Sequence, residues 1–133
     1  MKAIAAIFRV LLVLWVGSLW SLAWVTSTLF FRQPDRQLAG LLAGHLFSIE
    51  TYVGIAVAAL ALLLPGRTKF FWAYLAAGLL ALNEWVLRPV MVQARLHGAS
   101  FGLTFGAWHG VSALLYGIAC LATLVLVWKN DFR

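Results

Sequence analysis

The chain has 133 residues, of which 64% are hydrophobic and only 11% are charged, and its mean hydropathy is +0.95. A soluble domain is about 45–50% apolar and about 25% charged, so this composition indicates the lipid bilayer and excludes an ordinary soluble domain. The net charge of +6 is spread over the loops and ends of the chain. This distribution favours lipid headgroups over nucleic acid as the partner of the basic residues.

Four long apolar runs follow one another with short connections. The predicted spans cover residues 10–31, 38–64, 70–91 and 101–128. Each exceeds the ~20 residues that cross about 30 Å of hydrocarbon, and the first is too long for the core of a signal peptide. Because short connections force neighbouring helices to run antiparallel, the sequence predicts an all-α fold. This fold is a four-helix transmembrane bundle with up-down-up-down topology, and residues 1–133 form a single integral membrane domain.

Lysine and arginine positions predict the orientation of the bundle in the membrane. Four basic residues flank the first and third connections, namely Arg32, Arg36, Arg88 and Arg95. Six lie on the termini and the second connection, namely Lys2, Arg9, Arg67, Lys69, Lys129 and Arg133. The positive-inside rule therefore places both termini in the cytoplasm.

The sequence also predicts where some helices begin and how they pack. Asp35, Thr68 and Ser100 each precede a span, where an N-cap residue would lie. Glycines recur every four residues, a spacing that lets helix backbones approach closely. We expect this ladder to pack within the chain, with dimerisation as the alternative; its members are Gly40, Gly44, Gly98, Gly102, Gly106 and Gly110.

Five ionisable residues interrupt the predicted spans: His45, Glu50, Glu84, Arg88 and His109. A charged group in hydrocarbon costs on the order of 2.5–3.5 kcal/mol, so each needs a partner or a function. Positions along the helices place His45, Glu84 and His109 at similar depth in the same half of the membrane.

Each of these residues also has a structural explanation. Glu84 and Arg88 are spaced i, i+4 with the acid first, which favours a helical ion pair. His45 fits an interfacial histidine, and His109, one turn before Ser112, fits an imidazole bonded to a backbone or hydroxyl oxygen. Glu50 has only apolar residues or glycine at i±3 and i±4, so it must be protonated, hydrated or paired with another helix.

Three functional hypotheses compete with these structural roles. The two histidines could ligate a b-type haem, or they could hold a transition metal together with a glutamate. Alternatively, Glu50, Glu84 and His109 could relay protons or line a substrate path. No nucleophile triad, phosphate loop or dinucleotide fingerprint is present in the sequence, and Cys120 fits a small buried hydrophobe.

Several short motifs occur together in the order of a known family. They lie at residues 14–20, 34–40, 44–47, 88–90 and 107–112. Together they resemble the transmembrane protein 205-like family of small bacterial four-span proteins, whose domain has an undefined role. Seven residues fall on recurring motif positions of that family: Asp35, Arg36, Gly40, Gly44, Pro89, His109 and Ser112. His45 stands where many relatives carry glutamine, which argues against a haem ligated by two histidines.

The sequence thus predicts a non-enzymatic integral membrane protein, either an accessory subunit or a membrane-homeostasis factor. The resemblance implies the bacterial inner membrane, with lipid as the main partner and a membrane protein or a second copy as a further one. No cofactor is predicted. The alternative is a cofactor-binding or translocating protein that uses the intramembrane histidines and glutamates.

Overall fold

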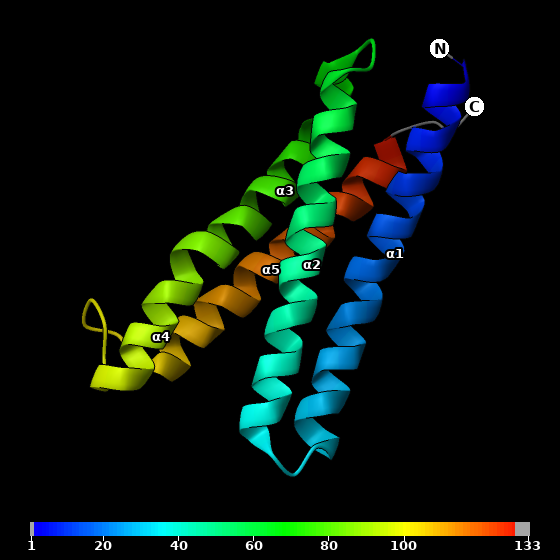
Figure 1. Cartoon of the computed structure of the whole chain (residues 1–133). Coiled ribbons are helices and arrows are strands. Elements are labelled where there is room, and N and C mark those ends of the chain that lie inside the picture. Colours follow the sequence, from blue (N-terminus) through cyan, green and yellow to red (C-terminus); the bar gives the residue numbers. More distant parts are fainter. Residues whose placement is uncertain (1, 130–133) are drawn as a thin grey trace.

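The computed structural model describes residues 2–129 and consists of four long helical spans (Figure 1). The helices are α1 (Lys2–Arg32), α2 (Arg36–Leu62), η1 (Arg67–Phe70), α3 (Phe71–Leu82), η2 (Asn83–Leu87), α4 (Arg88–His97) and α5 (Phe105–Lys129). η1 to α4 follow one another without a break and form the third span. All four spans are long and apolar enough to cross a membrane, so the predicted all-α fold class is confirmed.

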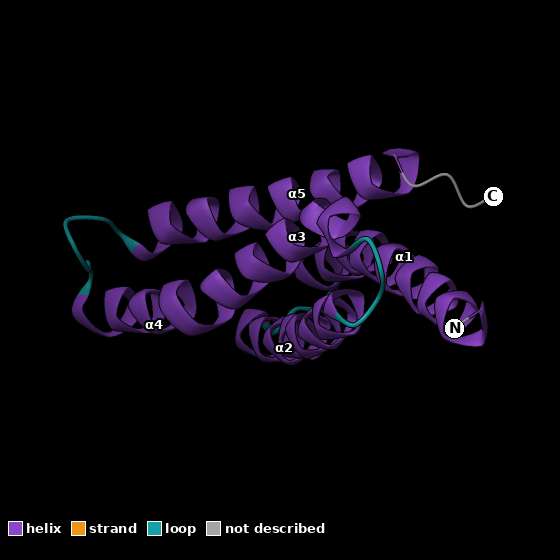
Figure 2. Ribbon diagram, turned by 90° about the horizontal axis from the view of Figure 1, so that it is seen from above, coloured by secondary structure: helices purple, strands orange, loops and turns teal. Residues whose placement is uncertain are grey.

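The four spans form two antiparallel pairs that cross each other. α1 pairs with α2, and α3 and α4 pair with α5, so that α3 and α4 lie between α2 and α5 in the end view (Figure 2). The start of α1 and the end of α5 lie at the same end of the molecule, which we call the terminal end (Figure 1). The opposite end holds the connections 33–35 and 98–104, and we call it the distal end. Toward this end the two pairs of helices diverge.

The helix boundaries differ from the predicted spans at several points: α1 begins at Lys2 rather than at residue 10, and the last two spans differ at the distal end. The third span continues to His97, six residues beyond the predicted limit, and α5 begins at Phe105 rather than at residue 101. The reason is a tight turn at residues 98–103, in which Ser100 and Leu103 exchange backbone hydrogen bonds of 2.9 and 3.0 Å. Gly98 and Gly102 support this turn with φ angles of 81° and 77°, which glycine adopts at little cost.

One of the three predicted N-caps is confirmed and two are wrong. The Asp35 carboxylate accepts hydrogen bonds from the backbone N–H groups of Gln37 and Leu38 at 3.0 and 3.1 Å. Thr68 instead lies inside η1, and Ser100 lies in the turn before α5. Thr104 takes the capping role for α5, because its hydroxyl oxygen accepts from the Ala107 N–H at 3.3 Å.

A close contact between a tryptophan ring and a glycine joins α1 to α2. Trp15 is 1% exposed, and its ring lies against the backbone of Gly54. A Cβ atom at position 54 would lie 2.9 Å from Cζ2 of this ring, closer than real Cβ atoms approach other atoms. The missing side chain of Gly54 therefore makes room for the largest buried side chain of the core.

The predicted glycine ladder needs correction. Gly98 and Gly102 lie in the distal turn and belong to no helix. Gly106 and Gly110 lie on α5 but are exposed, and a Cβ at Gly110 would meet nothing within 4 Å. Within residues 2–129, only Gly44 of the proposed ladder has a close neighbour from another helix, the guanidinium group of Arg88.

The third span contains a π-helical turn, η2, which the sequence did not predict. In this turn the Arg88 N–H donates to the carbonyl oxygen of Asn83, five residues earlier. Pro89 follows directly and has no N–H to donate to the carbonyl oxygen of Trp85. The wider turn rotates the residues after it relative to α3, and such turns occur frequently at functional sites.

Candidate functional site

The predicted ion pair between Glu84 and Arg88 is present, and it joins the third span to α2. Nη1 of Arg88 lies 2.6 Å from Oε1 of Glu84. The same guanidinium nitrogen donates to the Ser48 hydroxyl oxygen at 2.7 Å, and this hydroxyl donates to Oε1 of Glu84, also at 2.7 Å. The three side chains therefore form a closed triangle between two spans, which gives each charged group a partner inside the membrane.

Gly44 provides the space in which the guanidinium group lies. A Cβ atom at position 44 would lie 2.9 Å from Nη2 of Arg88. The side chain of Arg88 remains 40% exposed, whereas that of Glu84 is only 14% exposed. The pair is thus half-buried, with the carboxylate on the protein side and the guanidinium edge toward the surroundings.

A second polar contact links the π turn to α5. Nδ2 of Asn83 donates to the backbone oxygen of Ser112 at 3.1 Å, and the Ser112 hydroxyl donates to Oδ1 of Asn83 at 2.6 Å. Asn83 thus bonds to α5 while Glu84, the next residue, bonds to α2. We call Ser48, Asn83, Glu84, Arg88 and Ser112 the distal polar network. Sequence reasoning selected three of the five and missed Ser48 and Asn83, whose only signal was a polar side chain within an apolar run.

The two candidate histidines do not join this network. Both His45 and His109 are exposed. The ring of His109 contacts aromatic rings, with centroids 6.0 Å from Phe105 and 6.4 Å from Phe30. Since α3 and α4 lie between α2 and α5 (Figure 2), the structure does not bring the two histidines into one inward-facing layer.

This arrangement bears on the haem and metal hypotheses. Two exposed histidines on separated helices do not enclose a porphyrin between them. Within the described residues there is also no group of three or more His, Cys, Asp or Glu side chains that could hold a metal ion. The geometry therefore offers no support for the ligand sets that the sequence suggested.

Glu50 lies apart from the distal polar network, where α1, α2 and α5 meet. It is 8% exposed, and its Oε2 atom has no hydrogen-bond partner among residues 2–129. Ser18 of α1 lies beside its carboxyl group, and Tyr116 and Cys120 of α5 are close enough to interact with it electrostatically. Glu50 is therefore the most deeply buried acid of the described chain, and it lacks both an ion pair and a hydrogen bond at Oε2.

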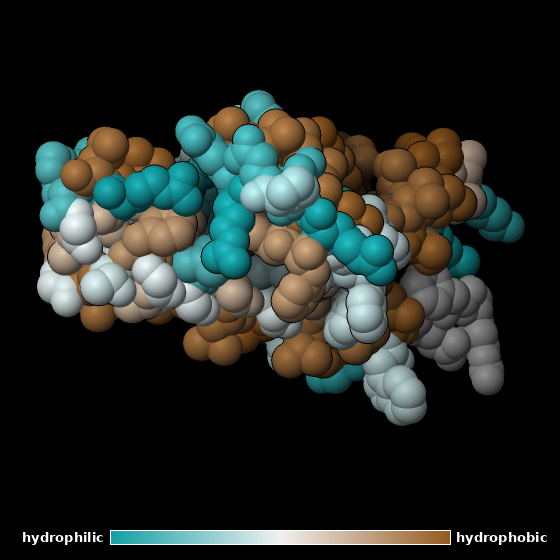
Figure 3. All heavy atoms as spheres, turned by 90° about the horizontal axis from the view of Figure 1, so that it is seen from below, coloured by the Kyte–Doolittle hydropathy of each residue, from teal (hydrophilic) through white to brown (hydrophobic). Residues whose placement is uncertain are grey.

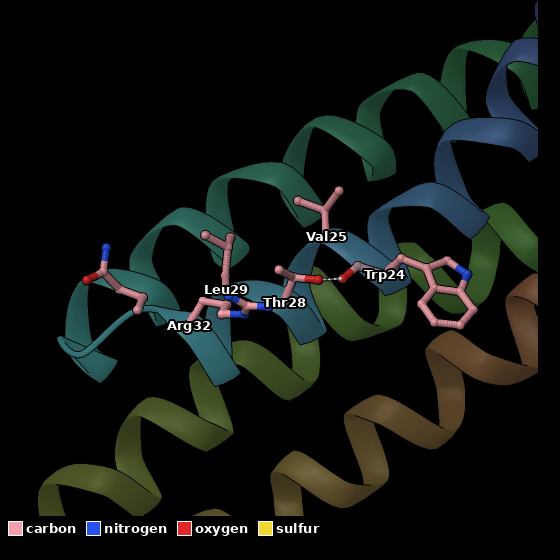
Figure 4. A pocket seen from close by; sticks show the side chains of 6 residues that line it. Trp24, Val25, Thr28, Leu29 and Arg32 are labelled. Carbon is pink, nitrogen blue, oxygen red and sulfur yellow. Dashed lines mark hydrogen bonds between the residues drawn. The ribbon is translucent and has the colours of Figure 1, made fainter.

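An open groove of about 430 Å³ runs along the distal part of α1. The residues that line it are Trp24, Val25, Thr28, Leu29, Arg32 and Gln33 (Figure 4). Trp24 is 77% exposed, and the Thr28 hydroxyl bonds to its own helix at the carbonyl of Trp24. The groove thus carries polar groups at its distal end and apolar groups deeper in the span.

Together, the fold and the buried polar groups define a multi-pass α-helical membrane protein. A family model described as a domain of unknown function (DUF4149) matches residues 10–100, and the chain belongs to this family. The match covers Glu50, the groove on α1 and four of the five residues of the distal polar network, and it ends before α5. No curated protein and no solved structure matches the chain.

Proposed function

We propose that this chain is a non-enzymatic protein of the bacterial inner membrane that contributes to membrane homeostasis by binding an anionic phospholipid. We also propose that the chain is related to the transmembrane protein 205-like family, whose motifs it resembles. Four apolar spans support a role within the bilayer. The groove along α1 supports lipid as the ligand, as the order of its lining residues explains.

The groove on α1 repeats the polarity of a phospholipid molecule. Arg32 and Gln33 lie at its distal end, where a headgroup phosphate would meet a guanidinium group and an amide. Thr28 lies one turn deeper, at the level of the glycerol esters. Val25 and Trp24 follow, and their apolar surfaces suit an acyl chain. This order of charged, polar and apolar groups is the observation that carries the proposal.

Charge at the distal end favours an anionic headgroup over a zwitterionic one. Four arginines lie in this half of the molecule against two acids, Asp35 and Glu84. Arg88 is paired with Glu84, and the guanidinium group of Arg95 lies 4.4 Å above the ring of Phe105. Hydrophilic side chains spread over this end of the molecule (Figure 3). A basic residue near a membrane surface contributes about 1 kcal/mol toward anionic lipid.

The lipid preference can be measured with one matched pair of variants. The protein is extracted into mixed micelles that contain phosphatidylglycerol and phosphatidylcholine with the same acyl chains, and bound lipid is counted by native mass spectrometry. We expect Arg32→Gln to reduce the preference for phosphatidylglycerol by about 5-fold, as the loss of about 1 kcal/mol predicts. Arg36→Gln removes the same charge at the start of α2, across the short connection 33–35 and outside the groove, and should retain the preference.

Two results would contradict the lipid proposal. One is an equal loss in both variants, because this would show that the total charge of the distal end attracts lipid and that the groove does not. The other is the absence of any preference together with a membrane protein that co-purifies at fixed stoichiometry. This second result would support the accessory-subunit role instead.

We also propose that both termini face the cytoplasm, so that the groove opens in the outer leaflet. The excess of Lys and Arg at the terminal end supports this orientation. In a Cys120→Ala background, Ser100→Cys places a thiol at the distal end and Thr68→Cys places one at the terminal end. A membrane-impermeant thiol reagent should label Ser100→Cys in intact spheroplasts and Thr68→Cys only after permeabilisation. The reverse pattern would overturn the proposed orientation.

A further inference from the structure

Glu50 is a buried carboxyl group in the bundle that forms no ion pair with any residue from 2 to 129. The one ion pair among residues 2–129 joins Arg88 to Glu84 and does not include Glu50. An ionised carboxylate that loses water without gaining a charged partner costs several kcal/mol. Since Oε2 of Glu50 also lacks a hydrogen bond among the described residues, the arrangement accommodates the neutral acid far better than the anion.

The groups that face Glu50 can hydrogen-bond but carry no positive charge. α1 presents Ser18, and α5 presents Tyr116 and Cys120. Nε1 of Trp15 is buried and, like Oε2 of Glu50, has no partner within residues 2–129. Trp15 packs on Gly54, one turn from Glu50 on the same face of α2, so an unused donor and an unused acceptor share one interface.

Polar side chains continue from Glu50 along the inward face of α5. Ser112, Tyr116, Cys120 and Thr123 are spaced by about one turn each, and the last three are buried. The Tyr116 hydroxyl donates to the backbone oxygen of Leu19 on α1, and the Thr123 hydroxyl donates to the Cys120 carbonyl at 2.6 Å. Ser112, at the distal end of this row, is bonded to Asn83. The row therefore extends along α5 from the level of Glu50 to Ser112 in the distal polar network.

We propose that Glu50 is a proton-binding site in the middle of the membrane, with a proton that exchanges with water through the polar row on α5. The ligand is a single proton, because the groups around the carboxyl group are hydroxyl, thiol and indole groups and offer no second carboxylate to a metal cation. This site is separate from the groove on α1 and goes beyond the lipid binding proposed above.

A hydrophobic carbodiimide tests the protonated state directly. A carboxylic acid adds across one C=N bond of the reagent: its proton goes to a nitrogen, its oxygen bonds the central carbon, and the adduct rearranges to a stable N-acylurea. Peptide mass spectrometry of the full-length protein then locates the label. At neutral pH we expect Glu50 to exceed the exposed Asp35 in labelling by at least about tenfold, because a carboxyl group in water is almost wholly ionised there.

Two variants and one exchange measurement complete the test. Glu50→Gln should abolish the label, whereas Glu84→Gln should leave it unchanged because Glu84 lies in the other cluster. In infrared spectra of the wild-type protein, the carbonyl band of the protonated acid should shift after transfer to heavy water and should be missing in Glu50→Gln. If Glu50→Gln fails to fold, the label on the wild-type peptide still decides the protonation state.

Three outcomes would overturn the proposal. Equal labelling of Glu50 and Asp35 would show that Glu50 is ionised. A carbonyl band that never shifts in heavy water would show a locked proton and a purely structural acid. Protection of Glu50 by sodium ions at constant pH, with potassium as the control, would show that a cation occupies the site in place of a proton.

Discussion

Replacing Arg88 with leucine is expected to lower the free energy of unfolding by about 2 kcal/mol. The change leaves the Glu84 carboxylate, of which only 14% of the side chain is exposed, without its cation. Removing one partner of a fully buried pair costs about 3–5 kcal/mol, and the 40% exposure of Arg88 reduces that value. Denaturant titration in mixed micelles, followed by tryptophan fluorescence, measures the difference.

The double variant separates the charge from the packing. Arg88→Leu combined with Glu84→Gln has no unpaired charge, so we expect it to recover more than half of the lost stability. Arg95→Leu is the matched control, because it also removes an arginine from the third span. Among residues 2–129, Arg95 contacts the ring of Phe105 and forms no ion pair, so its loss should cost no more than about 1 kcal/mol. If the double variant were less stable than Arg88→Leu, the triangle with Ser48 would depend on hydrogen bonding and packing more than on charge.

Replacing Gly54 with leucine is expected to destabilise the protein by about 3 kcal/mol. The new side chain would have to enter the space held by the Trp15 ring, which is 1% exposed and cannot swing into solvent. Inserting atoms into a packed core typically costs about 1–3 kcal/mol. We expect a cost at the upper end of this range because the rigid indole ring cannot change its shape to make room. The same titration measures the effect.

Gly78→Leu is the control for this prediction. Gly78 lies on α3, is exposed, and a Cβ there would meet nothing within 4 Å. The substitution adds the same atoms to a helix of similar composition, and in the membrane the new side chain faces lipid. Stability should therefore stay within about 0.5 kcal/mol of the wild type, as for surface substitutions. An equal loss in both variants would show that any larger residue in these spans is harmful.

Hydropathy predicted the number and the order of the spans because each apolar run is longer than a membrane crossing requires. The i, i+4 spacing predicted the pair of Glu84 and Arg88 because both residues lie on one helix, where spacing sets distance. Hydropathy did not predict the turn at residues 98–103, because the turn contains apolar residues such as Phe101 and Leu103. There, the backbone freedom of two glycines outweighs the hydropathy of their neighbours.

Contacts between helices were beyond sequence reasoning because they depend on the rotation of each span about its own axis. The π turn shows this most clearly, since one additional residue per turn changes the direction of every later side chain. For the same reason, equal depth in the membrane did not mean that His45 and His109 meet.

The unequal lengths of the spans make the protein sensitive to the thickness of its bilayer. The first and third spans have 31 residues each, roughly 46 Å of helix at about 1.5 Å per residue, whereas the fourth has 25. Longer helices share one bilayer with a shorter one by tilting, and a thinner membrane requires more tilt. Ser48, Glu84 and Arg88 bond α2 to the third span. A change of tilt between these two spans would therefore alter the distances within this triangle of side chains. Lipid composition would thereby change the strain on this triangle without any ligand binding to it.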